Sequence, residues 1–376
     1  MFMSKQEDSN TIRILLAGDY APGGLVANIP GYSPFNPIES VILDHDVCWL
    51  NLECGFPFGN KAITNRSAKV PGDWDLFLRL HRLYENRFIY TMGNNHTTDY
   101  GRDSIRTLQK HIKRLQLPIR GVGNTPQEIH DYHVWHKDGL SVAMLSFTWD
   151  RKCVGDHLQE ESGTMLPILN EDSYKQVQQA AASHTHVIVS IHWGKEYVKY
   201  PLPEMRAQAQ RMVQAGATLV FGHHPHVLQG METIEGVPVY YSLGNFFFPA
   251  YDSPNRLRWT KNSRLGMVLS CTLNADGLEE VIPVPVYQPG NIEPIQTMQG
   301  DKLKEFHGIL NKLSHPLAQL SAIRYELFFE KQLRHLLYGK LLKSAVKTIL
   351  RPSKRRAVLT GYIVQQIRTG RNWFLN

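Results

Sequence analysis

Apolar segments of strand length alternate with helical patterns through the first three quarters of this chain. This alternation is the sequence pattern of an α/β domain, in which helices pack on the strands of a sheet. The predicted strands are Ile12–Ala17, Val47–Leu50, Phe88–Met92, Val142–Phe147, Val187–Ile191, Leu219–Phe221, Val237–Ser242, Met267–Leu273 and Val281–Val286. The predicted helices are Asp73–Tyr84, Asp103–Leu115, Asp172–Ala182 and Glu204–Ala215. The pattern therefore favours one large α/β domain.

The periodicity becomes helical near Gly300, so we expect an α/β domain over residues 1–298 and a helical region over residues 299–376. A chain of 376 residues, 42% of them hydrophobic, is long enough for a large core. No segment approaches the roughly 20 consecutive apolar residues of a membrane-spanning helix. The segment Met1–Thr11 is polar and lacks the order of a secretory signal, so we expect a cytoplasmic protein.

The positive charge of the chain is concentrated at its C-terminal end. From Lys331 onward there are eleven Lys or Arg and no Asp or Glu, which leaves 30 basic against 34 acidic residues elsewhere. Apolar residues at helical spacing accompany this charge, namely Leu333, Leu336, Leu337, Leu341, Leu342, Tyr362, Ile363 and Ile367. Two interpretations remain open: a helical appendage packed on the α/β body, or a helix lying on an anionic membrane surface. The rest of the chain is net negative, and we expect no nucleic-acid partner.

The four cysteines Cys48, Cys54, Cys153 and Cys271 show no CxxC pair and no regular spacing. Neither a zinc ribbon nor a disulfide framework is indicated, and reduced, buried thiols are expected.

Polar residues that can bind metals recur where the predicted strands end. The short sequences at these points are Gly18-Asp19, Asn51-Leu52-Glu53, Gly93-Asn94-Asn95-His96, His192-Trp193-Gly194, Gly222-His223-His224-Pro225-His226 and Leu243-Gly244-Asn245. Open α/β sheets place ligands at the carboxyl ends of their strands. Six such strand ends in one chain therefore indicate a shared site.

The residue types at these strand ends suit a site for two divalent metal ions. Such a site uses carboxylates, neutral imidazoles and carbonyl oxygens, and it lowers the pKa of bound water. The residues that supply this set are Asp19, Glu53, Asn95, His192, His224 and His226. In an extended segment the HxH spacing of His224 and His226 would place both rings on one side. Mixed nitrogen and oxygen ligands suit Mn, Fe or Zn without selecting one of them.

Each of these residues also has a simpler structural explanation. A lone histidine such as His192 is more often a surface or core residue than a ligand. A Gly-Asp pair after a strand is commonly a turn, the Asn94-Asn95 pair fits a turn equally, and His223 is explained as a spacer. Pro225 is harder to explain in this way, because its ring fixes the backbone between two histidines. The joint pattern favours a metal site.

Six separated motifs of the chain resemble, in the same order, those of the CapA family of bacterial capsule and poly-γ-glutamate synthesis proteins. Beside Gly18-Asp19 and Asn51-Leu52-Glu53, they are the runs Asn94 to Gly101, His192 to Tyr197, Gly222 to Gln229 and Tyr241 to Phe246. The resemblance covers roughly Ile12 to Val286 and implies a fold similar to the calcineurin-like metallophosphoesterases, with two packed sheets flanked by helices.

The resemblance also implies roles for single residues. It implies that His96 is the catalytic histidine. It also implies that the ligands of two divalent metal ions are Asp19, Glu53, Asn95, His192, His224 and His226. Further site candidates are Asn51, Asn94, Glu196, His223 and Asn245. The chain departs from the usual metallophosphoesterase pattern where Tyr20 and Ala21, instead of x-His, follow Asp19.

Other hydrolase classes lack their motifs in this chain. The sequence around Ser242 lacks the first glycine of G-x-S-x-G, and no complete P-loop or G-x-G-x-x-G occurs. Two functions then remain. One is a metal-dependent hydrolase of a phosphoester, or of an amide or glycosidic linkage in a cell-envelope polymer. The other is a non-catalytic accessory protein of polymer synthesis or export, whose metals are structural or bind the polymer. A capsule-related role suits a location at the inner face of the membrane.

Overall fold

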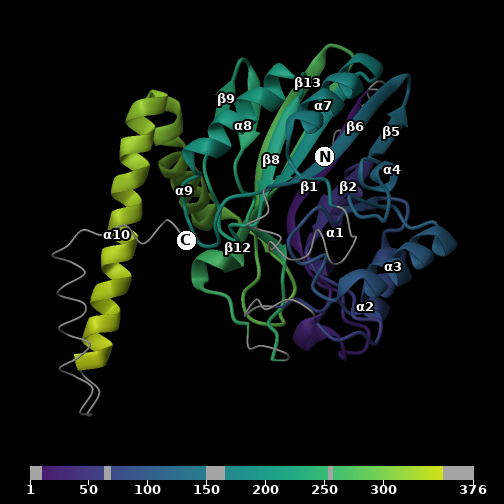
Figure 1. Ribbon diagram of the computed structural model, residues 1–376, viewed down its shortest axis with the longest axis horizontal. Coiled ribbons are helices and arrows are strands. Elements are labelled where there is room, and N and C mark those ends of the chain that lie inside the picture. Colours follow the sequence, from purple (N-terminus) through teal and green to yellow (C-terminus); the bar gives the residue numbers. More distant parts are fainter. Residues whose placement is uncertain (1–10, 63–68, 150–165, 253–256, 350–376) are drawn as a thin grey trace, which may run out of the picture. The chain divides into compact units, whose positions relative to one another are not determined.

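The computed structural model describes residues 11–62, 69–149, 166–252 and 257–349 (Figure 1). These residues belong to two compact units, of which the first ends at Gln319 and the second begins at Leu320. All the strands described below belong to the first unit.

The first sheet has eight strands, and its central strand is β1 (Ile12–Tyr20). Along one side the order continues with β2 (Val47–Leu52), β3 (Phe88–Thr91) and β4 (Ile119–Arg120). Along the other side it continues with β12 (Leu265–Asn274), β13 (Gly277–Tyr287) and β14 (Gln296–Thr297), and β11 (Asn245–Phe247) also pairs with β1. Because β1, β2, β3, β4 and β11 pair in parallel, their carboxyl ends meet at one edge.

The second sheet has six strands in the order β5-β6-β7-β8-β10-β9. Their bounds are β5 (His133–Lys137), β6 (Leu140–Thr148), β7 (His186–His192), β8 (Leu219–His223), β10 (Val237–Tyr240) and β9 (Met231–Ile234). The four central strands are parallel, and β5 and β9 pair antiparallel at the two edges.

The alternation of side chains along β1 explains how the two sheets pack. Ile12, Ile14 and Leu16 belong to a buried cluster that also contains apolar residues of the second sheet. Leu15 and Ala17, which point to the opposite face, belong to a different cluster that contains residues of helices α2 and α3. One core therefore lies between the sheets, and the other lies between the first sheet and its helices.

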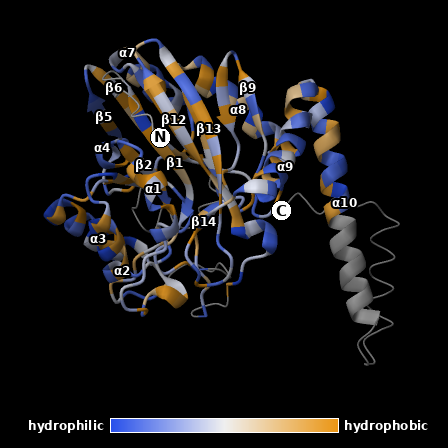
Figure 2. Ribbon diagram, turned by 180° about the vertical axis from the view of Figure 1, so that it is seen from behind, coloured by the Kyte–Doolittle hydropathy of each residue, from blue (hydrophilic) through white to orange (hydrophobic). Residues whose placement is uncertain are grey.

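The helices cover the outer faces of the sheets. On the first sheet lie α2 (Trp74–Leu83) and α3 (Gly101–Leu115), and on the second lie α7 (Glu171–Ser183) and α8 (Pro203–Gln214). Figure 2 shows hydrophobic and hydrophilic residues alternating around α3, as a helix with one buried face requires. The short helices α1 (Glu39–Leu43) and α4 (Pro126–Ile129) lie in connections.

The expected sandwich of two sheets flanked by helices is confirmed. Each of the nine predicted strands and four predicted helices occurs in the structure, with ends that differ by a few residues. Of the cysteines, Cys48, Cys54 and Cys271 are buried free thiols, and Cys153 lies outside the described residues.

The helical part of the chain begins with α9 (Gly300–Gln319), close to the sequence boundary at residue 299. Helix α9 belongs to the first unit, where it packs on β9 and buries Phe306, Leu310 and Leu313 in the core between the sheets. The second unit contains helix α10 (Ala322–Ile349). The apolar positions Tyr362, Ile363 and Ile367 lie outside the described residues. Within the described part of the chain, no helix is both long enough and apolar enough to cross a membrane.

Candidate metal centre

The strand register brings polar residues of five of the six motifs into two rows. In the first sheet, Asp19 on β1 is paired with Asn51 on β2 and with Asn245 on β11. In the second sheet, His192 on β7 is paired with His223 on β8. These residues were expected to follow the strands, but the ladders of hydrogen bonds extend to include them at or next to the ends of the strands. Their backbone positions are therefore fixed by the sheets.

Gly18 allows β1 to approach the segment before β11 closely enough to hold Asp19. A Cβ atom at Gly18 would lie 2.0 Å from the carbonyl oxygen of Gly244, a distance that no side chain tolerates. This carbonyl accepts a hydrogen bond of 3.1 Å from the backbone N–H of Asp19. The glycine of the Gly-Asp motif thus has a packing role that directly sets the position of the carboxylate.

Two buried carboxylates lie at the centre of the candidate site. Asp19 Oδ1 accepts a hydrogen bond of 2.9 Å from Asn51 Nδ2, and Asp19 Oδ2 lies 3.2 Å from His226 Nδ1. Glu53 Oε1 lies 3.5 Å from His192 Nε2 and 3.5 Å from His226 Nε2. Both carboxylates are completely buried. Burial of charge at this density requires partners of opposite charge or metal ions.

The backbone around His224 and His226 is bent, not extended. Both residues have positive φ angles, 91° and 53°, which residues other than glycine rarely adopt. The two rings still come close together, with centroids 6.1 Å apart. The expected proximity is therefore achieved by a strained turn through Pro225 and not by the alternation of a strand. Backbone strain of this kind is concentrated at functional sites.

Two groups of three side chains can each surround one metal ion. One group is Glu53, His224 and His226, and the other is Asp19, Glu53 and His192. Within each group the candidate ligand atoms lie within 4.8 Å of one another, and every residue is buried. Glu53 belongs to both groups, so a pair of ions held by these groups would share it as a ligand.

The two carboxylates differ in their tendency to ionise. Burial opposes the ionised form of Asp19, but hydrogen bonds from His223 and His226 outweigh it and hold the pKa well below its ordinary value. Burial, and then the neighbouring Asp19, raise the pKa of Glu53 well above its ordinary value. Since a metal ligand must be deprotonated, binding of an ion beside Glu53 would release a proton.

The histidines are also affected by burial. Burial and the neighbouring His224 lower the pKa of His192 well below its ordinary value, so its ring is neutral and has a lone pair for a metal. Burial alone would lower the pKa of His226, but its hydrogen bond with Asp19 outweighs this effect and raises the pKa. The ring of His226 thus has a carboxylate near each nitrogen, Asp19 near Nδ1 and Glu53 near Nε2.

Asn95 and His96 occupy different environments although they are adjacent. Asn95 Oδ1 lies 2.6 Å from His192 Nε2, so these two candidate ligands are in contact. His96 Nδ1 lies 2.9 Å from Asp99 Oδ2, in a buried pair. The preceding Asn94 holds the loop, because its Oδ1 accepts hydrogen bonds from the backbone N–H groups of His96 and Thr97.

The remaining predicted residues surround this centre. Asn51 Nδ2 lies 3.3 Å from His192 Nδ1, and His223 Nδ1 lies 3.2 Å from Asp19 Oδ1. Asn245 Oδ1 lies 2.9 Å from His226 Nδ1 and so orients this ring. Glu196 is exposed in the turn after β7, and its charge adds to the rise in the pKa of Glu53.

Sequence reasoning missed some residues that contact the site. Asp99, three residues after His96, was visible within its motif but was assigned no role. The rings of Trp259 and Phe248 lie 5.0 Å and 5.4 Å from the ring of His226. Neither residue carried a signal in the sequence, because only the fold brings the segment after β11 against the histidines.

The sequence profile of the family described as bacterial capsule synthesis protein PGA_cap matches residues 13–250. Over 212 residues the chain is 31% identical to the capsule biosynthesis protein CapA of Bacillus anthracis, a match that covers 55% of this chain and 49% of that protein. Over 205 residues it is 30% identical to the PGA biosynthesis protein CapA of Bacillus subtilis (strain 168), covering 54% and 52%. The matches thus span about half the length of these curated relatives.

Two solved structures are similar in outline to this chain. A hypothetical protein from Thermus thermophilus has a TM-score of 0.49 and 12% identity, covering 74% of this chain and 100% of that chain. The NAD nucleotidase of Haemophilus influenzae has a TM-score of 0.39 and 14% identity, covering 87% and 60%. The profile match includes all six motifs in full and covers more than half of the chain. This chain therefore belongs to the PGA_cap family of bacterial capsule synthesis proteins.

Proposed function

We propose that this chain is a hydrolase that depends on two divalent metal ions, which the two ligand groups that share Glu53 would hold. The observation that carries the proposal is that Glu53 belongs to both groups of candidate ligands. A structural site for one tetrahedral ion would need only four ligands and no shared carboxylate. Paired ions on a shared carboxylate are typical of enzymes that activate water and stabilise a leaving oxygen.

The donor atoms fit such a pair of ions. Carboxylate oxygens, imidazole nitrogens and an amide oxygen suit Mn, Fe or Zn, and no thiol contributes to either group. Asp19 and Glu53 bring two negative charges against the four positive charges of two divalent ions. The remaining positive charge favours an anionic nucleophile and an anionic group on the substrate. When bound, the ions would lower the pKa of water and polarise the bond to be cleaved.

His96 is the residue to which we assign proton transfer. The contact of its Nδ1 with Asp99 Oδ2 holds the ring in one orientation and favours a proton on Nδ1 in the neutral ring. After protonation, Nε2 is the atom that can donate to a leaving group. Asp99 is itself held in place, since its Oδ2 accepts a hydrogen bond of 3.0 Å from the backbone N–H of Val70. Asp99 is therefore a positioning residue for His96.

For the substrate we propose a phosphoester, or an amide or glycosidic linkage in a cell-envelope polymer. The proposal draws on the family and on the names of its relatives, one of which is a capsule and the other a PGA biosynthesis protein.

Turnover of a generic phosphodiester tests the proposal. The chain, loaded with Mn²⁺ or Zn²⁺, is given bis(p-nitrophenyl) phosphate and, separately, purified capsule polymer and poly-γ-glutamate. We expect hydrolysis of at least one of them that requires the added ion and is lost in Glu53→Gln. His136→Ala, which removes an exposed histidine on β5, is the matched control and should retain full activity. A fully metal-loaded protein that hydrolyses none of them would favour the accessory role in polymer synthesis or export.

A further inference from the structure

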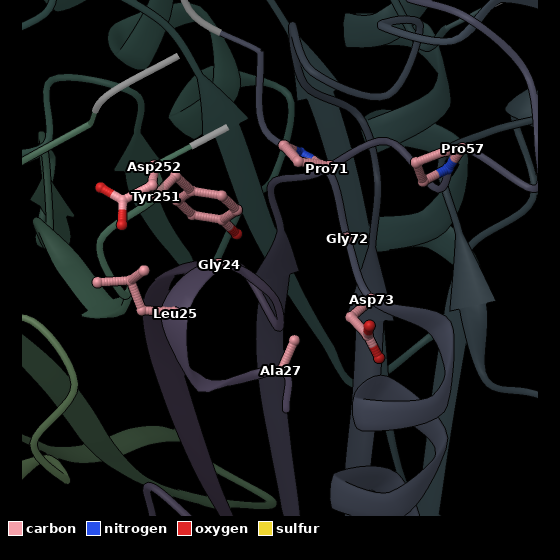
Figure 3. Close-up of a pocket in the computed structure, with 9 residues that line it drawn as sticks. All are labelled: Gly24, Leu25, Ala27, Pro57, Pro71, Gly72, Asp73, Tyr251 and Asp252. Carbon is pink, nitrogen blue, oxygen red and sulfur yellow. The ribbon is translucent and has the colours of Figure 1, made fainter. Parts of the chain in front are cut away.

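A pocket of about 350 Å³ lies among the segments that follow three strands of the first sheet (Figure 3). Its lining residues are Gly24, Leu25, Ala27, Pro57, Pro71, Gly72, Asp73, Tyr251 and Asp252. They come from three segments, which follow β1, β2 and β11. These are the strands whose ends place Asp19, Glu53 and Asn245. The pocket therefore opens at the same edge of the first sheet as the metal centre.

The hydroxyl group of Tyr251 is a buried polar group that lacks a partner. The side chain is 1% exposed, and its hydroxyl makes no hydrogen bond within the described part of the chain. Figure 3 shows this hydroxyl directed toward the glycine-lined interior of the pocket. Burial raises the pKa of Tyr251 well above its ordinary value, so the group stays an O–H. A buried hydroxyl without a partner is costly, and a ligand that bonds to it would recover that cost.

The walls of the pocket are fixed by the backbone. Leu25 N donates a hydrogen bond of 2.8 Å to the carbonyl of Ala250, and Asp73 N donates one of 2.7 Å to the carbonyl of Pro22. A Cβ atom at Gly24 would lie 2.4 Å from the oxygen of Ala250, so this approach requires glycine. A Cβ atom at Gly72 would lie 2.6 Å from the sulfur of Cys54. The pocket is therefore formed before a ligand arrives, which lowers the entropic cost of binding.

The polar groups of the lining select against anions. Asp73 and Asp252 contribute carboxylates, and no Lys, Arg or His occurs among the nine described lining residues. Asp252 forms an ion pair with Arg258, which lies outside the lining, so Asp73 is the carboxylate that would repel a carboxylate or phosphate group in the pocket. Hydroxyl groups can instead donate to carboxylates, and the four apolar residues Leu25, Ala27, Pro57 and Pro71 suit the apolar face of a sugar ring.

We infer that this pocket binds an uncharged, hydroxyl-rich ring, such as a hexose unit of a cell-envelope glycan. The pocket is linked to the metal centre by neighbouring rings: the ring of Phe248 lies 5.4 Å from that of His226 and 6.3 Å from that of Tyr251. A sugar bound in the pocket would lie close to the bond that the metal centre cleaves. This statement rests on the proposed function. Binding of a sugar unit next to the cleaved linkage would contribute energy for the reaction at the metal centre.

Saturation-transfer NMR with methyl glycosides of glucose, galactose and N-acetylglucosamine tests the pocket directly. We expect at least one glycoside to bind the full chain, and tri-γ-glutamate not to displace it. Tyr251→Phe, which removes only the hydroxyl, should weaken binding roughly 2- to 10-fold, the effect of one hydrogen bond. Ala27→Phe should fill the pocket and abolish binding, while Asn28→Phe adds the same ring at an exposed neighbour outside the lining and should leave binding unchanged.

Metal content and phosphodiester turnover are measured on the same variants. These measurements distinguish a failure of the proposed glycoside binding from a failure of the proposed hydrolase activity. Glycoside binding that Ala27→Phe and Tyr251→Phe reduce supports the pocket, even in a protein without turnover. No binding of any of the three glycosides, equal binding by wild type and both variants, or displacement by tri-γ-glutamate would overturn the inference while leaving the metal centre untouched.

Discussion

Asn95 and His96 are neighbours whose side chains have different partners, which separates their predicted roles. Asn95 contacts the candidate ligand His192, whereas His96 contacts Asp99. We expect Asn95→Ala to weaken metal binding. We expect His96→Ala to retain the metal and to lower turnover by about 10²–10⁴, the contribution of a positioned general acid.

Metal analysis and single-substrate kinetics on both variants check this division of roles. Asp99→Asn is informative beside them, because it keeps the shape of the side chain but weakens its hold on His96. It should lower kcat and alter its dependence on pH while leaving metal content unchanged. A His96→Ala protein that loses its metal and keeps its turnover would show that the roles are reversed.

At single residues, the sequence was informative about chemistry and uninformative about backbone geometry. The residue types of Asp19, Glu53 and His192, and their positions after strands, were enough to predict that they lie in one site. Parallel strands place their carboxyl ends together. The left-handed backbone of His224 and His226 was not predictable, since residues other than glycine rarely adopt it.

At the scale of secondary structure, the close approach of β1 and the segment before β11 holds the site. Gly18→Ala would bring a Cβ atom against the carbonyl of Gly244 and push the two segments apart. We expect a loss of stability on the order of 3 kcal/mol, as overpacking causes, together with weaker metal binding, because Asp19 is displaced. Urea unfolding and metal titration measure the two effects.

Gly308→Ala is the matched control for this substitution. Gly308 lies exposed in helix α9, and a Cβ atom there would meet no atom within 4 Å. Alanine is the better helix former by about 1 kcal/mol, so this variant should be more stable than wild type and bind metal equally. Equal stability of Gly18→Ala and wild type would contradict the packing role of Gly18.

His133 joins the two sheets and makes their packing sensitive to acid. Its Nε2 lies 3.1 Å from the carbonyl oxygen of Tyr90 on β3, and burial lowers the pKa of His133 from 6.5 to about 4. Between these pH values the unfolded chain binds the proton and the folded chain does not. Stability is therefore lost as the pH falls from about 6.5 to about 4, by roughly 3 kcal/mol from this residue.

Urea unfolding at several pH values measures this loss. His133→Gln can keep a donor for the Tyr90 carbonyl but has no group that titrates, so its stability should fall less steeply than that of wild type over this range. Parallel pH profiles for the two proteins would contradict the assignment.

The nine strands predicted from the sequence were those with continuous apolar segments. The edge strand β5 was missed because its residues His133–Lys137 are mostly polar or half-buried, and β9 was missed because it is short and amphipathic. Edge strands bury one face at most, so their apolar pattern is weak.

At the scale of the whole chain, the charge divides unevenly between the body and the C-terminal segment. The eleven basic residues from Lys331 onward are not offset by any acidic residue, while the remainder is net negative. Co-sedimentation with anionic vesicles, with and without Lys331–Asn376, distinguishes the two interpretations of this segment. Binding at low salt that is lost at high salt and on truncation is expected of a helix on anionic lipid. Binding that is absent, or unchanged by truncation, is expected of a packed appendage.

The central claim is that Glu53 bridges two divalent ions. Anomalous diffraction from crystals of the chain grown with Mn²⁺ measures this directly. We expect two peaks roughly 3.5–4 Å apart, the separation of paired catalytic ions, one beside His224 and His226 and the other beside Asp19 and His192, with Glu53 between them. A single peak, or peaks that do not contact Glu53, would contradict the account.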